Sequence, residues 1–318
     1  MHETMAPNIA GIHHVTAIAG DPQENLAFYT QILGLRLVKQ TVNFDDPSTY
    51  HLYFGDRVGS PGTAMTFFPI DMTGTGTIGK GQVISTAFTV PSGSLDWWEG
   101  HLRAHEVDIE GTFERFGERE LAITDHDGLR LELTERDDGP PVEPWTEVID
   151  GEHAIAGFDG VTIDSTAPEA TEEVLDILGF ELLDSDDDRR RFATEGAYGR
   201  FVDLVDSSGH HGRSGPGTVH HVAVRTEDEA TQLEWRDTLI DAGYNVTPVR
   251  DRQYFKSIYF REPGGVLFEI ATDGPGFELD ESVDELGTSL RLPTWLEDNA
   301  KAIERQLPPL DIPREVTR

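Results

Sequence analysis

The chain of 318 residues contains no cysteine. This absence excludes a disulfide framework, metal sites built from thiolates and a cysteine nucleophile. Long hydrophobic runs are also missing, and none approaches the roughly 20 apolar residues that a membrane-spanning helix needs. Residues 1–10 lack a basic region followed by an apolar run, so no signal peptide is expected. These absences predict a soluble, cytoplasmic protein without a membrane partner.

Positive charge is scarce as well. The chain has 25 lysine and arginine residues against 59 aspartate and glutamate residues, which gives a formal charge of −34. A protein this acidic repels nucleic acid and anionic membrane surfaces. The acidic residues are spread along the chain instead of forming a tail, a pattern that indicates adaptation to high salt, where screening weakens their mutual repulsion. The composition therefore predicts a halophilic source and no nucleic-acid partner, but it does not indicate a reaction.

An internal repeat organises the sequence. Its clearest copy begins with the alternating run 219–225, which predicts a strand, and continues with a helical pattern over 228–242. Gly243 is placed to end that helix. Three short strand-like runs then follow, at 245–249, 256–261 and 266–272. The unit is therefore β-α-β-β-β.

Three earlier segments follow the same order. The first copy is predicted as a strand, a helix from Pro22 to Leu33 and three strands, with the strands at 12–19, 37–41, 50–55 and 63–68. The second and third copies are predicted from their first strand, helix and last strand, at 83–90, 95–104 and 129–133, and at 157–164, 168–178 and 200–205. One further helix is expected in the tail, at 295–306.

These repeats predict an α+β fold of four βαβββ modules. Two modules side by side can form a strongly curved sheet, a cup with helices outside and a hollow for a ligand. The proline-rich, acidic stretch 137–152 is the best domain boundary. It divides the chain into residues 1–145, an N-terminal pair of modules, and 146–318, a C-terminal pair with the tail.

Two histidine pairs occupy equivalent positions in the first and fourth copies. The pairs are His13-His14 and His220-His221, and Glu269 lies in the last strand of the fourth copy. Two imidazoles and one carboxylate, with other positions left open, are typical of non-haem Fe(II) sites that activate oxygen. A single strand histidine is more often a core or surface residue, but the symmetric placement favours a metal site.

Aligning the repeats gives a topological prediction. At the first-strand position the copies carry His14, Thr86 or its neighbour Ser85, Gly160 and His221; at the last-strand position they carry Thr66, Glu132, Asp203 and Glu269. If one ion is bound by His14, His221 and Glu269, the first and fourth modules must share one cup and the second and third another. Strand alternation turns His13 and His220 away from this site unless a β-bulge redirects them.

Several segments resemble one known superfamily. They include TVHHVAV at 218–224 and RDRQYFKSIYFREPGGVLFEIATDGPGF at 250–277, together with 11–56, 59–69 and 292–310. They resemble the vicinal oxygen chelate superfamily of glyoxalases, bleomycin-resistance proteins and dioxygenases. Within it the chain is most similar to ring-cleaving dioxygenases that act on hydroquinones. The acidic third copy matches least.

The resemblance implies a function and a site. It implies Fe(II), with Mn(II) or another divalent metal as alternatives, and a reaction between a small aromatic substrate and O2. In that family the metal is bound by residues matching His14, His221 and Glu269. The other functional positions match the following five residues: His13, Thr16, His220, Arg252 and Tyr259.

Each of these positions has a physical role to fill. Arg252 can pair with a phenolate oxygen, Tyr259 can hydrogen-bond the substrate, and His220 can act as an acid or base. For Arg252 the competing interpretation is a surface arginine, and for Tyr259 a core aromatic residue. Phe67, Phe255 and Phe268 are expected to help exclude water, although strand alternation turns Phe268 away from the site.

Two rival functions remain open at this point. A glyoxalase-like, metal-dependent isomerase or lyase typically uses two histidines and two glutamates, and here the fourth place falls on Thr66. A metal-free binding protein of the resistance type would not need the three ligands together. The sequence leaves the ring substituents and the oligomeric state open, with a homo-oligomer among the alternatives.

Overall fold

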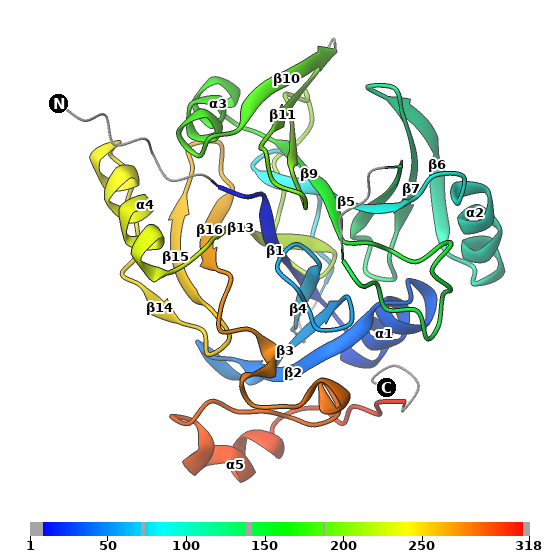
Figure 1. Ribbon diagram of the computed structural model, residues 1–318, viewed down its shortest axis with the longest axis vertical. Coiled ribbons are helices and arrows are strands. Elements are labelled where there is room, and N and C mark those ends of the chain that lie inside the picture. The colour runs from blue at the N-terminus through cyan, green and yellow to red at the C-terminus, as the bar shows by residue number, and fades with distance from the viewer. Residues whose placement is uncertain (1–8, 71–73, 138–141, 187, 314–318) are drawn as a thin grey trace.

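The computed structural model describes residues 9–70, 74–137, 142–186 and 188–313. Its elements follow one another as four βαβββ modules (Figure 1). The first module contains β1 (Ile12–Ala19), α1 (Pro22–Ala27), a π-helical turn η1 (Phe28–Ile32), β2 (Arg36–Asn43), β3 (Asp46–Gly55) and β4 (Ala64–Pro69). The second contains β5 (Gln82–Pro91), α2 (Leu95–Ala104), β6 (Asp108–Arg115), β7 (Glu118–Thr124) and β8 (Arg130–Arg136).

The second half of the chain repeats the pattern. The third module contains β9 (Phe158–Asp164), α3 (Pro168–Ile177), β10 (Glu181–Asp186), β11 (Arg189–Ala193) and β12 (Phe201–Val205). The fourth contains β13 (Thr218–Thr226), α4 (Glu229–Asp241), β14 (Arg250–Asp251), β15 (Lys256–Arg261) and β16 (Leu267–Thr272). The tail contains η2 (Phe277–Leu279), η3 (Val283–Glu285), η4 (Glu297–Asn299) and α5 (Ala300–Glu304).

The strands form two eight-stranded sheets with the predicted module pairing. One sheet has the order β14-β15-β16-β13-β1-β4-β3-β2, and the other has the order β10-β11-β12-β9-β5-β8-β7-β6. The first and fourth modules therefore share one sheet, and the second and third share the other. Within each sheet the two modules meet through their first strands, β1 against β13 and β5 against β9, both antiparallel. The prediction of crossed pairing is confirmed.

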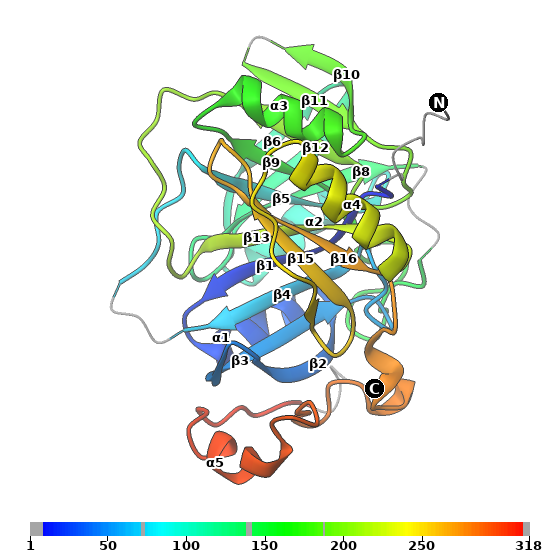
Figure 2. The same cartoon turned by 90° about the vertical axis from the view of Figure 1, so that its left-hand side faces the viewer.

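The helices cover the outside of the curved sheets, as both views show (Figures 1 and 2). Trp98 of α2 and Trp235 of α4 are fully buried in the core, and α3 buries the aliphatic Val174 and Leu175. The α4 helix begins where the Asp228 carboxylate accepts a hydrogen bond from the Thr231 amide at 2.8 Å, a regular N-cap. It ends before Gly243, whose φ of +94° suits glycine.

Two predicted elements differ from the structure. Residues 245–249 do not form a strand; only Arg250–Asp251 pairs with β15. Pro248 lacks an amide hydrogen and disfavours regular pairing. Among these described residues, Thr247 alone bonds β15: its amide donates to the Tyr259 carbonyl, and its side chain accepts from the Tyr259 amide, both at 3.0 Å. The tail helix predicted at 295–306 is reduced to the short helices η4 and α5.

The tail and the linker both pack against the first module. Leu290 forms a β-bridge with Gln40 of β2, which covers that edge strand (Figure 2). Within the predicted linker, residues 138–141 lie outside the described residues, and Ile149 is buried against Gly34. The division at residue 145 remains a proposal, while each sheet takes one module from either side of it. No helix in the described part of the chain is long and apolar enough to cross a membrane.

Candidate metal centre

The site is built where β1 and β13 pair at the centre of the first sheet. The pairing places Thr16 opposite His221 and His14 opposite Ala223, but the register shifts twice. One shift falls between Ile12 and His14 and therefore includes His13; the other falls opposite Thr16 and Ala17 and includes His220. These irregularities are β-bulges of one residue, and they lie at the two histidines that strict alternation would turn away from the site.

The three predicted ligands converge. The His14 Nε2 and His221 Nε2 atoms lie 3.3 Å apart. Glu269 Oε2 lies 3.4 Å from His14 Nε2 and 3.0 Å from His221 Nε2. All three residues are buried, and together they form a group that could hold a metal ion. The neighbouring modules bring these atoms together across a sequence separation of 207 residues between the histidines.

The bulged histidines contact the ligand histidines from behind. His13 Nδ1 lies 2.9 Å from His14 Nδ1, and His220 Nδ1 lies 2.8 Å from His221 Nδ1. Burial, and then the neighbouring His14, lowers the pKa of His13 well below its ordinary value, so its ring is neutral and can accept. If each ligand histidine donates from Nδ1, its Nε2 lone pair is free for a metal. The contacts place His13 and His220 where each could orient the ring of the neighbouring predicted ligand.

Glu269 is prepared as an anion. Burial alone raises the pKa of a carboxyl group, but the adjacent His14 and His221 outweigh it and hold the pKa of Glu269 well below its usual range. Its Oε1 atom accepts a hydrogen bond from Ser257 at 2.5 Å, while Oε2 is buried and faces the two imidazole Nε2 atoms. A buried carboxylate oxygen beside two imidazole nitrogens fits a divalent cation by the chemistry of its donors.

The fourth position of the site carries a hydrogen-bonded chain instead of a second carboxylate. In the fourth module, Glu269 of β16 pairs with Ala223, two residues after His221. In the first module, Thr66 of β4 pairs with Thr16, two residues after His14, so Thr66 is the equivalent of Glu269. Thr66 Oγ1 lies 2.7 Å from Thr16 Oγ1 and 2.9 Å from His51 Nε2. His51 Nδ1 lies 2.8 Å from the Tyr53 hydroxyl, which completes the chain. Thr66 is therefore already engaged, and this side of the site offers no fourth anionic ligand.

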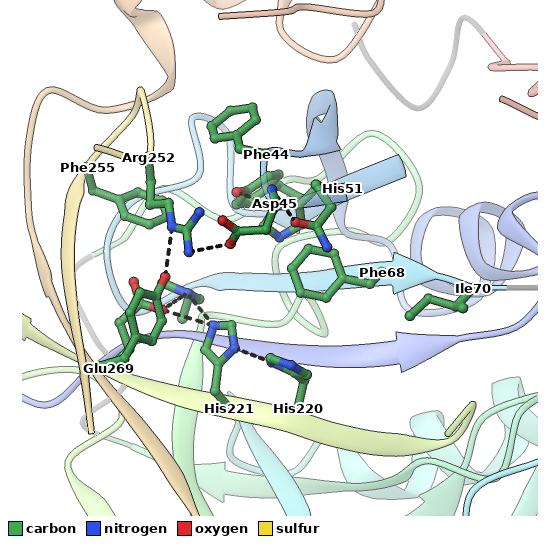
Figure 3. A pocket seen from close by; sticks show the side chains of 14 residues that line it. Phe44, Asp45, His51, Phe68, Ile70, His220, His221, Arg252, Phe255 and Glu269 are labelled. Atoms are coloured by element: carbon green, nitrogen blue, oxygen red, sulfur yellow. Dashed lines mark hydrogen bonds and ion pairs between the residues drawn. The ribbon is translucent and has the colours of Figure 1, made fainter. Parts of the chain in front are cut away.

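A cavity of about 220 Å³ opens over the three ligands. Its wall includes aromatic and aliphatic side chains from both modules, and Figure 3 shows Phe44, Phe68, Phe255 and Ile70 around it. Arg252 Nε donates to the Tyr259 hydroxyl at 3.0 Å, and both side chains line the cavity. The prediction for Phe67 is wrong, because it packs against Tyr29 in the core and leaves Phe68 at the cavity.

The second sheet has a different interior at the equivalent positions. In the first sheet, Glu269 pairs with Ala223, two residues after His221. In the second sheet, Glu132 pairs with Ala87, so Ser85, two residues earlier, is the equivalent of His221, and Thr86 is not. Glu132 is held by Arg115 at 2.9 Å, and Asp203 by Arg191 at 2.7 Å. Guanidinium groups thus neutralise the carboxylates of this sheet. Among the described residues, only the first sheet has a histidine and carboxylate group suited to a metal.

The structure brings most of the predicted site residues to one place. His220, Arg252 and Tyr259 line the cavity with the three proposed ligands, whereas His13 and Thr16 lie behind it. Three contacts were not predicted: His51 beside Thr66, Ser257 on Glu269, and Asp45 on Arg252. The alternation of side chains along a strand could have indicated two of these contacts. His51 and Tyr53 lie on one face of β3, and Ser257 lies on the same face of β15 as Tyr259.

The fold and site together define a class of protein. Paired βαβββ modules around a central two-histidine, one-glutamate group are the arrangement expected for the vicinal oxygen chelate proteins. The sequence model described as the Glyoxalase/Bleomycin resistance protein/Dioxygenase superfamily matches residues 11–133 and 164–270. The chain belongs to this superfamily.

Curated relatives cover nearly the whole chain. The Bacillus subtilis (strain 168) protein named "Putative ring-cleaving dioxygenase MhqO" is 47% identical, over 97% of this chain and 99% of its own length. "Chlorohydroquinone/hydroquinone 1,2-dioxygenase" of Sphingobium indicum is 34% identical, over 91% of this chain and 93% of its own.

A solved structure agrees with this relationship. The crystal structure of a "putative dioxygenase from Bacillus subtilis subsp. subtilis str. 168" superimposes with a TM-score of 0.93 at 46% identity, covering 97% of this chain and 99% of that one. Glyoxalase I from Zea mays is similar in fold alone, with a TM-score of 0.61 at 16% identity over 83% of this chain and 92% of that one.

Proposed function

We propose that the chain is a metal-dependent, ring-cleaving dioxygenase that inserts O2 into a hydroquinone- or catechol-type aromatic compound. The observation that carries the proposal is the convergence of His14, His221 and Glu269 at the base of an aromatic-lined cavity. The relatives named as ring-cleaving and hydroquinone dioxygenases support the same reaction class. The metal we propose is Fe(II), with Mn(II) as the alternative that accepts the same ligands.

When bound, the metal would lower the pKa of a coordinated substrate hydroxyl and transfer electrons between the ring and O2. The chain's own residues supply binding and orientation. Phe44, Phe68 and Phe255 enclose the flat ring and exclude water, and the Tyr259 hydroxyl reaches the same cavity. The positive charge of Arg252 beside Tyr259 stabilises a phenolate oxygen. The reaction needs no external reductant, because a ring C–C bond breaks and both oxygen atoms enter the product.

The two rival functions are less well supported. A glyoxalase-type site with a second glutamate is not available, since Thr66 occupies that register position and is bonded to Thr16 and His51. A metal-free binding protein would have no need of a buried carboxylate whose Oε2 atom lies 3.4 and 3.0 Å from the Nε2 atoms of two histidines. Both features favour a three-ligand metal site.

The direct test combines metal analysis and oxygen uptake. Protein purified without oxygen is expected to contain a divalent transition metal and to consume O2 when hydroquinone or catechol is added. Glu269→Ala should remove the metal and reduce uptake at least a hundredfold, while the circular dichroism spectrum stays unchanged. Absence of bound metal in the parent protein, or full uptake by a folded variant, would contradict the proposal.

A further inference from the structure

The mouth of the cavity contains one ion pair between the two modules. Asp45 lies in the turn between β2 and β3, and Arg252 follows β14. An Arg252 terminal nitrogen lies 2.9 Å from Asp45 Oδ2, and Figure 3 shows the two side chains joined over the cavity. The Arg252 side chain is 18% exposed and the Asp45 side chain 67% exposed. The solvent-facing partner is therefore the carboxylate.

Arg252 is held in place by its own loop. Its amide donates to the Phe255 carbonyl at 2.9 Å, and the Tyr254 amide donates to the Arg252 carbonyl at 2.7 Å. Gln253, between them, has a φ of +67°, so the turn is tight. With Nε on Tyr259 and a terminal nitrogen on Asp45, the guanidinium spans the cavity wall from the metal side to the mouth.

Arg252 is the only lysine or arginine among the described residues that line this cavity. The rest of its wall is aromatic, aliphatic, neutral and polar, or acidic. Apart from the proposed metal, a ring that carried a carboxylate would therefore have one cation to pair with, and Asp45 already occupies a terminal nitrogen of that guanidinium. A ring with only hydroxyl, halogen or alkyl substituents meets no such competition.

We propose that Asp45 is a specificity-determining residue that makes the cavity select hydroquinones and catechols without an acidic substituent and reject ring carboxylates. This inference rests on the proposed function, because it names the substrate class of the same site. Asp45 acts as a charge filter: it competes with an anionic substituent for Arg252 and repels it at the entrance.

The test compares binding of two small probes that lack a second hydroxyl for cleavage, phenol and 4-hydroxybenzoate. Both are titrated calorimetrically into anaerobic, metal-loaded protein at one ionic strength. The parent protein is expected to bind phenol more tightly. Asp45→Asn should lower the Kd of 4-hydroxybenzoate by roughly fivefold, the range of a partly exposed ion pair, and leave that of phenol within about twofold.

Asp46→Asn is the matched control. It removes the same charge from the adjacent residue, whose carboxylate bonds the Ser48 hydroxyl at 2.6 Å. It should leave the ratio of the two Kd values as in the parent protein. Equal effects of both substitutions, no effect of Asp45→Asn, or tighter parent binding of 4-hydroxybenzoate than of phenol would each overturn the charge filter.

Oxygen uptake separates the two proposals. If the parent protein consumes O2 with hydroquinone but Asp45→Asn leaves the binding ratio unchanged, the charge filter is wrong and the dioxygenase proposal stands. If the ratio of the two Kd values changes as expected but no ring compound supports O2 consumption, the dioxygenase proposal fails. The charge filter then still holds as a property of ligand binding in this cavity.

Discussion

Ser257 controls the orientation of the proposed carboxylate ligand. Its hydroxyl bonds Glu269 Oε1 and leaves Oε2 directed at the two imidazoles. Removing a side chain that hydrogen-bonds a metal ligand typically lowers the metal affinity by about 10- to 100-fold. We therefore expect Ser257→Ala to weaken divalent-metal binding by about that factor, measured by competition with a coloured chelator.

The control for this substitution is Ser185→Ala, on the exposed strand β10. It should leave the metal affinity unchanged. If Ser257→Ala also binds metal like the parent protein while folding normally, then Ser257 only fills space beside Glu269.

The three proposed ligands could be predicted from the sequence because repeats place equivalent residues at equivalent positions. His14, His221 and Glu269 needed no knowledge of loops. His51 and Asp45 were missed for physical reasons. His51 contacts Thr66 on the neighbouring strand and none of the predicted ligands, and Asp45 lies in a turn, where the alternation of side chains along a strand does not apply. The roles of His13 and His220 depended on bulges, which insert one residue and erase the alternation used to predict them.

Among the elements, the second sheet shows what the same architecture becomes without the histidine group. Its hollow holds buried carboxylates and arginines in one network, in which Arg191 contacts both Asp203 and Glu118 at 2.7 and 2.6 Å. Burial, followed by repulsion from Glu132, raises the pKa of Glu120 to about 7, although Arg115 and Arg191 oppose the rise. Glu120 thus titrates near neutral pH.

This shift predicts how stability changes with pH. The folded-state pKa of Glu120, about 7, exceeds its model-peptide value of 4.5, so the folded state binds the proton more tightly than the unfolded state. The contribution of protonated Glu120 to the free energy of unfolding is fully present below pH 4.5 and is lost as the pH rises through 7. Glu120→Gln should therefore reduce the difference in unfolding free energy between pH 5 and pH 8, by about 1–3 kcal/mol.

Urea unfolding at the two pH values measures this effect. The exposed Glu114→Gln, on β6, should keep the difference seen in the parent protein. A Glu120→Gln variant with the parent's full pH dependence would show that another group titrates in this range.

The regular elements could largely be predicted from hydrophobic period and glycine positions; α2 spans 95–104 as expected. The predicted strand 245–249 and the predicted tail helix 295–306 failed, because the local hydrophobic pattern does not decide the structure of either segment. Pro248 interrupts the run 245–249, and the tail residues 295–306 pack on the body of the protein through side chains such as Ile303, which is buried in the core. Such a segment does not need a long helix to bury its apolar residues.

For the molecule as a whole, the formal charge of −34 is the dominant electrostatic fact. Mutual repulsion between acidic groups destabilises the compact state at low ionic strength, and salt screens it. We expect the melting temperature to rise by roughly 10 °C between 0.1 and 2 M sodium chloride, a gain of a few kcal/mol for a chain of this size.

Sucrose solutions with no added salt are the control, because they favour the compact state without screening charge. A melting temperature that is flat or falls with salt would contradict the high-salt interpretation of the composition.

The crossed pairing of modules also sets an order of assembly during synthesis. The second and third modules are consecutive, so their sheet can close while the ribosome is still making the fourth. The first module can pair β1 with β4, but the other edge of β1 has no partner until β13 emerges more than half a chain later. A metal ion cannot be enclosed by all three proposed ligands before Glu269 is made, so loading is confined to nearly finished chains. A product that ends before β13 would keep the sheet of the second and third modules and leave one edge of β1 exposed, a position prone to pairing with other chains.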